Sequence, residues 1–183
     1  KTAIVFGGIA GGLIVAAGLV ATFLEGASLS ELFGYGSMLV GLSMVFIGVK
    51  RYRDRELGGV IRFTTALLVG LAISAVATMI YVVAWEVNLF VTDYTFISDY
   101  AQSMIAAREA SGASPEELES YRKEVADMVV NYGNPLFRIP MTFIEIFPVG
   151  LLVSLLSAAI LRNSRVLPAS GPAPYSPGRA RPT

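Results

Sequence analysis

Two stretches of 23 residues without a charged side chain, residues 2–24 and 63–85, constrain the fold of this chain most strongly. An α-helix rises about 1.5 Å per residue, so each stretch is long enough to cross a hydrocarbon core about 30 Å thick. Residues 32–49 and the stretch between Arg138 and Arg162 are similarly apolar. We therefore expect an all-α, polytopic membrane protein with four transmembrane helices at about residues 2–24, 32–49, 63–86 and 138–161.

The composition agrees with this class and excludes several kinds of chemistry. Hydrophobic residues make up 54% of the chain and charged residues only 15%, which is too apolar for an ordinary soluble domain. The absence of cysteine and histidine excludes disulfides, thiolate and imidazole catalysis and most zinc sites. We find no nucleotide-binding glycine loop, metal-ligand spacing, catalytic carboxylate pair or folded basic surface. We therefore expect no enzymatic activity, cofactor, metal site or nucleic-acid partner.

Small residues recur at intervals of four in two of the predicted spans. Such patterns allow helices in lipid to pack closely, either within one chain or in a homo-oligomer. Close packing is a commoner use of this pattern than ligand binding. The residues expected at helix contacts are Gly7, Gly8, Gly11, Gly12, Gly70 and Ser74.

Residues 93–133 contain charges throughout, with apolar residues at helical spacing, which predicts an amphipathic helical hairpin between the third and fourth spans. Ser114 is suited to an N-cap, Pro115 to the first helical position and Glu117 to a capping box with Ser114. The hairpin has three candidate roles: it lies on the membrane surface, covers the bundle or docks a membrane-protein partner. Its apolar stripe is equally explained by contact between its own two helices.

The distribution of basic residues predicts the orientation of the chain. Ten of the fourteen Lys and Arg residues lie at the N-terminus, in residues 50–62 or in residues 162–183, which four spans place on one side of the membrane. Basic loops stay in the cytoplasm, so both termini are expected inside and the hairpin in the periplasm. Residues 163–183 are rich in proline and are expected to form a disordered cytoplasmic tail. Lys50, Arg51, Arg53 and Arg55 are expected in a basic cytoplasmic loop, either as a topology determinant or as a site for anionic lipid headgroups or an acidic partner.

Glu145 is the most unusual residue, because it lies seven positions inside the fourth span. An ionised carboxylate at the bilayer centre costs about 2.5–3.5 kcal/mol on insertion scales, so the group must face protein or water, or be protonated. It is either a proton or cation site or a hydrogen-bonded structural acid. Helix directions place Tyr35, Tyr81, Glu86 and Arg138 at similar depth, with Glu86 about two turns nearer the surface than Glu145.

Several short motifs resemble a family of small bacterial inner-membrane proteins classed as a domain of unknown function. They are Gly34-Tyr35-Gly36-Ser37-Met38, Phe46-Ile47-Gly48-Val49-Lys50-Arg51-Tyr52-Arg53-Asp54, Asn134-Pro135-Leu136-Phe137-Arg138 and Glu145-Ile146-Phe147-Pro148-Val149-Gly150. The resemblance covers roughly residues 3 to 162. It implies four spans with a charged insertion before the last, and it carries no known activity.

The sequence therefore predicts a transmembrane domain over residues 1–162, including the hairpin, followed by the tail. The expected function is that of a noncatalytic integral inner-membrane protein, an interaction or accessory subunit of a membrane assembly. The alternative is a small oligomeric transporter or channel component that uses Glu145 as a proton or cation site. A membrane enzyme using Glu86, Tyr81 and Glu145 ranks third, because the clustered acids and bases of such chemistry are missing.

Overall fold

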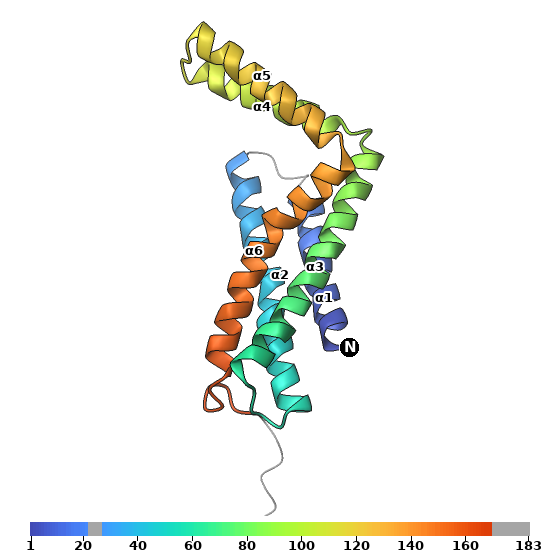
Figure 1. Ribbon diagram of the computed structural model, residues 1–183, viewed down its shortest axis with the longest axis vertical. Helices are drawn as coiled ribbons and strands as arrows, with labels where there is room; N and C mark the ends of the chain where they lie inside the picture. Colours follow the sequence, from blue (N-terminus) through green and yellow to red (C-terminus); the bar gives the residue numbers. More distant parts are fainter. Residues whose placement is uncertain (22–26, 170–183) are drawn as a thin grey trace, which may run out of the picture.

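The structure is a computed structural model that describes residues 1–21 and 27–169, apart from the side chains of several residues in α1 and the first half of α2. The described residues contain six α-helices and no strand, so the predicted all-α class is confirmed for this part of the chain. The helices are α1 (Thr2–Ala21), α2 (Ala27–Glu56), α3 (Phe63–Val91), α4 (Thr95–Ala110), α5 (Pro115–Tyr132) and α6 (Pro135–Leu161) (Figure 1).

The four long helices α1, α2, α3 and α6 form an elongated bundle, and the α4–α5 hairpin lies beyond one end of it (Figure 1). α3 packs against α6 and α1, and α1 also packs against α2. We call the end formed by residues 86–138 the hairpin end. The opposite end, formed by residues 50–62 and 161–169, is the basic end.

The long helices have apolar outer faces. Among the described residues, α3 and α6 are long and apolar enough to cross a membrane, and α1 has a shorter apolar stretch, Thr2–Gly18. Each of the four carries large apolar side chains that point outward, including Ile4, Leu39, Leu68 (67% exposed) and Ile144 (67% exposed). A helix that is apolar on all sides requires a surrounding of protein or lipid.

Small residues bring α3 and α6 close together. The Ser74 hydroxyl donates a hydrogen bond to the Gly150 carbonyl, and it lies 3.2 Å from the Ser154 hydroxyl. A Cβ atom added at Gly70 would lie 2.9 Å from the Ser154 Cβ, so glycine permits this approach. The two pairs at i, i+4 spacing, Gly70/Ser74 on α3 and Gly150/Ser154 on α6, therefore face each other.

The glycines of α1 divide into two groups. A Cβ added at Gly7 would lie 2.6 Å from the Val76 Cβ, and one at Gly11 would lie 2.9 Å from the Ile80 Cβ, so both glycines face α3. A Cβ at Gly8 or Gly12 would meet no described atom within 4 Å. The expected small-residue contact is therefore made by one row of glycines, and Gly8 and Gly12 lie outside it.

The predicted loop at Lys50 is wrong, because α2 continues through the basic run to Glu56. Lys and Arg are good helix formers, and Lys50 pairs with Asp54 one turn later at 2.5 Å. The helix therefore extends beyond its apolar part instead of ending with it. The chain then turns at Gly58 and Gly59, whose φ values of 65° and 93° favour glycine.

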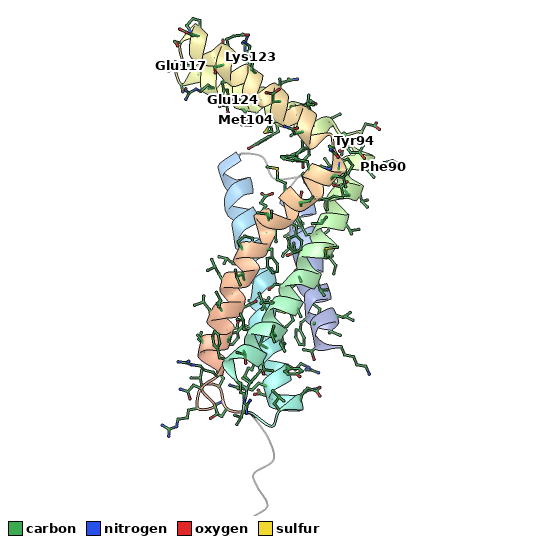
Figure 2. All side chains as sticks on the ribbon, viewed as in Figure 1. Phe90, Tyr94, Met104, Glu117, Lys123 and Glu124 are labelled. Atoms are coloured by element: carbon green, nitrogen blue, oxygen red, sulfur yellow. The ribbon has the colours of Figure 1, made fainter. Side chains whose placement is uncertain are left out.

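The hairpin contains the predicted capping box. The Ser114 hydroxyl accepts a hydrogen bond from the Glu117 backbone N–H, and the Glu117 carboxylate accepts one from the Ser114 N–H. These two bonds lower the pKa of Glu117 below its usual value. Ala101 of α4 and Val125 of α5 are buried in the hairpin, while charged side chains such as Lys123 and Glu124 lie on its surface (Figure 2).

Candidate functional site

Arg138 is the central side chain of the hairpin end. It belongs to the first turn of α6 and is only 2% exposed. Its Nε and Nη2 atoms donate to the two carboxylate oxygens of Glu86 on α3, at 2.8 and 2.6 Å, and Nη1 donates to the Tyr132 carbonyl at 2.9 Å. The guanidinium also lies over the rings of Tyr94 and Tyr132. Arg138 therefore joins α3, α5 and α6 where the hairpin meets the bundle.

This geometry separates Arg138 and Glu86 from Glu145, although all three were predicted to belong to one site. A bidentate arginine–carboxylate pair is among the strongest charged hydrogen-bond arrangements in proteins. Both Glu86 oxygens accept from Arg138, so Glu86 has a structural partner of opposite charge. Glu145 belongs to a different group of side chains.

A pocket of about 400 Å³ lies between α3, α6 and the hairpin. Its wall contains side chains from four helices: Tyr81, Trp85, Phe96, Ile97, Tyr100, Met128, Tyr132, Met141, Thr142 and Glu145. The aromatic rings are in mutual contact, with the Trp85 ring stacked on Tyr81 at 6.4 Å and edge-on to Phe96 at 4.8 Å. The Trp85 Nε1–H donates to the Tyr132 hydroxyl at 2.7 Å and so fixes α3 to α5.

Glu145 is the acidic side chain of this wall. It is exposed, and none of the side chains that the structure describes makes an ion pair or hydrogen bond with its carboxylate. The Glu145 carboxylate therefore faces an aromatic pocket without a basic partner among the described side chains. Burial raises the pKa of Tyr132 in the same wall, and the Glu145 and Glu86 carboxylates add to that rise.

The last two predicted site residues are Tyr81 and Tyr35, and only the side chain of Tyr81 belongs to the described part of the chain. Tyr81 lies in the pocket wall beside Trp85. Tyr35 lies in α2, and its side chain is outside the described residues.

Arg53 is the buried arginine of the basic end. It is 0% exposed and was expected in an open loop, but it lies in the last turns of α2. Its guanidinium donates to the carbonyls of Leu161, Val166 and Leu167, and to the Asp54 carboxylate. The segment just after α6 is therefore held against α2 through the Val166 and Leu167 carbonyls. Residues 170–183 lie outside the described part of the chain.

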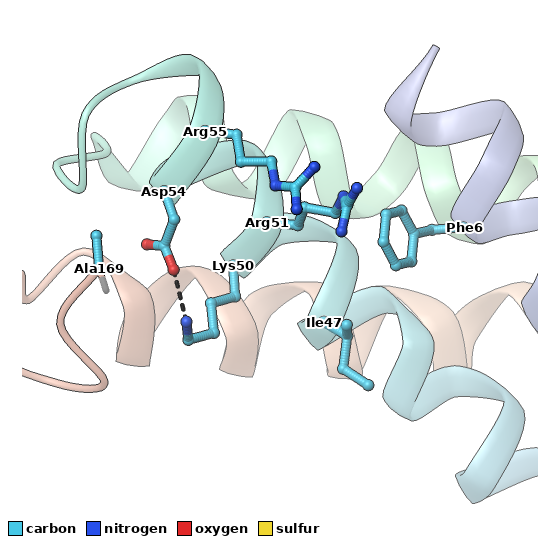
Figure 3. A pocket seen from close by; sticks show the side chains of 7 residues that line it. All are labelled: Phe6, Ile47, Lys50, Arg51, Asp54, Arg55 and Ala169. Carbon is cyan, nitrogen blue, oxygen red and sulfur yellow. Dashed lines mark hydrogen bonds and ion pairs between the residues drawn. The ribbon is translucent and has the colours of Figure 1, made fainter. Parts of the chain in front are cut away.

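A second pocket, of about 430 Å³, lies beside α1 and α2 at the basic end. The Arg51 and Arg55 side chains extend side by side toward Phe6 of α1, whereas Lys50 points away from them and pairs with Asp54 (Figure 3). Burial opposes ionisation of Asp54, but hydrogen bonds from Arg53 and Lys50 outweigh it and lower the pKa of this carboxyl. The pocket thus has three basic side chains and one acid in its wall.

The comparisons with known proteins give one match. Residues 6–163 match a family described as "Protein of unknown function (DUF4199)". The chain belongs to this family. No curated protein and no solved structure matches the chain.

The DUF4199 match extends from α1 through α6, so it includes both buried arginines, the whole wall of the pocket at the hairpin end and all of the second pocket's wall except Ala169. Sequence reasoning identified Arg138, Glu86, Tyr81 and Glu145 by their depth, but it did not select Trp85 as a site residue. It also missed the burial of Arg53. One sequence signal could have placed Arg53 in a helix. Lys50 and Asp54 have i, i+4 spacing, which favours continuation of the helix through the basic run.

Proposed function

We propose that this member of the DUF4199 family is a noncatalytic integral membrane protein that serves as an interaction or accessory subunit of a membrane assembly. Four spans are proposed, formed by α1, α2, α3 and α6, in the inner membrane of a bacterium. Support for four comes from the outward-facing apolar side chains that all four helices carry, in addition to the length of α3 and α6. The basic end is assigned to the cytoplasm and the hairpin to the periplasm by the positive-inside rule.

The observation that carries this proposal is the attachment of the hairpin. The buried Arg138 connects α3, α5 and α6, and the Trp85–Tyr132 hydrogen bond adds a second link. The hairpin therefore has a defined position while most of its own surface stays exposed (Figure 2). A preorganised surface of this kind lowers the entropic cost of binding another protein.

Site-specific photo-crosslinking in native membranes tests the interaction. A crosslinker at Val130 on the hairpin, which is 76% exposed, is expected to give one discrete protein adduct. The matched control is a crosslinker at Leu68, an apolar side chain on α3 with a similar exposed fraction. Recovery of only a monomer after gentle extraction, together with the same adducts from both positions, contradicts an accessory role.

A second function is favoured by the position of Glu145. Its carboxylate borders the pocket between the bundle and the hairpin, which suits a proton or cation site in a small transporter or channel. Four helices are few for a transport path, so this function requires a homo-oligomer. Liposome flux decides it: the parent is expected to conduct and Glu145→Gln to lose most of the flux. Equal flux in both, or none in either, removes this function.

A further inference from the structure

The pocket at the hairpin end combines aromatic rings with a single acidic side chain. Five of the ten residues in its wall are aromatic, and they come from α3, α4 and α5. Glu145 on α6 supplies the negative charge. The faces of aromatic rings carry negative electrostatic potential, so rings and carboxylate favour the same kind of ligand, a cation.

The hydrogen bonding of the rings shows which parts of them are available. Trp and Tyr at a membrane interface usually direct their polar edges to water or headgroups. Here the Trp85 N–H and the Tyr132 hydroxyl bind each other, and rings from three helices converge on one space. Trp85 therefore offers a ligand its ring surface and not its N–H group. Interfacial anchoring alone does not require such convergence.

The composition of the wall distinguishes between classes of cation. Ca²⁺ and Mg²⁺ need six or more oxygen ligands, often with several carboxylates. The described residues contain no group of three or more His, Cys, Asp or Glu side chains suited to a metal ion. A cation with carbon substituents makes apolar contact with Met128, Met141 and the rings while its charge stays near one carboxylate.

We propose that this pocket binds an organic ammonium ion, with its charge beside Glu145 and its alkyl groups against the rings of Trp85, Phe96 and Tyr100. Such a ligand contacts the hairpin and the bundle at once, because its wall residues come from both. Binding therefore stabilises the docked position of the hairpin. This inference goes beyond the functions proposed above and depends on neither a partner protein nor transport.

The only tryptophan of the chain, Trp85, lies in the pocket wall and serves as the probe. The full-length protein in detergent is titrated with tetramethylammonium chloride, with sodium chloride at equal ionic strength as the reference. A saturable change in tryptophan emission is expected with tetramethylammonium and not with sodium. Equal responses to the two salts overturn the proposal.

Two pairs of variants assign the binding to particular side chains. Glu145→Gln is expected to raise the midpoint concentration roughly tenfold, because a charged contact becomes neutral. Its control is Glu116→Gln, an exposed acid at the start of α5. Phe96→Leu is expected to raise the midpoint roughly two- to fivefold through loss of one cation–π contact. Its control is Phe90→Leu, on the exposed face of α3. An unchanged midpoint in Glu145→Gln overturns the proposal.

The same titration in lipid nanodiscs identifies the source of the ammonium group. Phosphatidylethanolamine carries an amine in its headgroup, and phosphatidylglycerol does not. A higher tetramethylammonium midpoint in phosphatidylethanolamine nanodiscs assigns the pocket to a lipid headgroup, and equal midpoints assign it to a soluble amine. Both results uphold an organic ammonium ligand. Because purified protein is used alone, failure here leaves the accessory and transport proposals standing, and their failure leaves this one standing.

Discussion

The two ends of α6 are each held by a buried arginine, but the two arginines bind different groups. Arg138, at the start of α6, meets a carboxylate from α3 and a carbonyl from α5. Arg53, near the end of α2, meets three carbonyls at and beyond the C-terminus of α6, and its carboxylate partner Asp54 is its own chain neighbour. One arginine pairs with a charge on another helix, and the other completes a helix end.

This difference shows how the buried charge is neutralised at each end of the bundle. Carbonyl groups at a helix C-terminus carry partial negative charge and have no partner within the helix, so a guanidinium satisfies them. At the basic end Asp54 retains Lys50 as a second partner. At the hairpin end Glu86 depends on Arg138, because Arg138 provides its only ion pair among the described residues. Loss of its buried arginine should therefore destabilise the hairpin end more than the basic end.

The largest effect is expected from Arg138→Met. Removing one member of a buried ion pair leaves an uncompensated charge, which typically costs about 3–5 kcal/mol. Denaturant unfolding in detergent measures this loss. The double variant Glu86→Gln/Arg138→Met should lose less than the sum of the two single changes. If Arg138→Met lowers the free energy of unfolding by no more than Arg53→Gln does, the two ends do not differ in their dependence on a buried arginine.

Arg53→Gln should cost about 1–3 kcal/mol, since it leaves one buried and two partly buried carbonyl groups without this donor. Hydrogen exchange is expected to become faster in residues 163–167, which Arg53 holds, and to stay unchanged in the hairpin. The matched control is Arg55→Gln, because Arg55 is exposed. Faster exchange in the hairpin instead would show that the two ends are not separate units.

Gly7→Ala tests the bundle away from both arginines. A methyl group at Gly7 would lie too close to Val76, and overpacking of this kind costs about 1–3 kcal/mol. Gly8→Ala meets open space in the described structure, so it should be neutral or slightly stabilising. Thermal unfolding of the two variants gives the comparison. Equal losses would mean that the α1–α3 contact is not set by Gly7.

The smallest expected effect concerns lipid binding at the basic end. Arg51 and Arg55 lie side by side near Phe6, so phosphatidylglycerol should co-purify in preference to zwitterionic lipid (Figure 3). Each Arg→Gln change should weaken this preference by roughly fivefold, equivalent to about 1 kcal/mol. Native mass spectrometry counts the bound lipids, with Arg122→Gln/Lys123→Gln on the hairpin as the control. Loss of lipid in the control variant alone would reverse the assignment of the two ends.

Local signals in the sequence predicted most of the helices. They did not predict the contacts between side chains that lie far apart in the chain. Charge-free runs and the Ser114–Glu117 capping box gave the helices and the hairpin, because both depend on neighbouring residues. The Arg138–Glu86 pair joins positions 52 apart, and Arg53 reaches carbonyls more than 100 residues away. Spacing rules contain no information about such contacts. The end of α2 was misplaced for a related reason, since loss of hydrophobicity marks the end of an apolar face and not the end of a helix.

Small residues on α3 and α6 should also make α6 rigid relative to the rest of the bundle. Serine and glycine allow these two helices to touch with little side-chain volume between them, and arginines fasten α6 at both ends. We expect a helix held in this way to move as a rigid body. A displacement of the hairpin should then be transmitted along α6 to residues 163–167, which contact Arg53 at the far end.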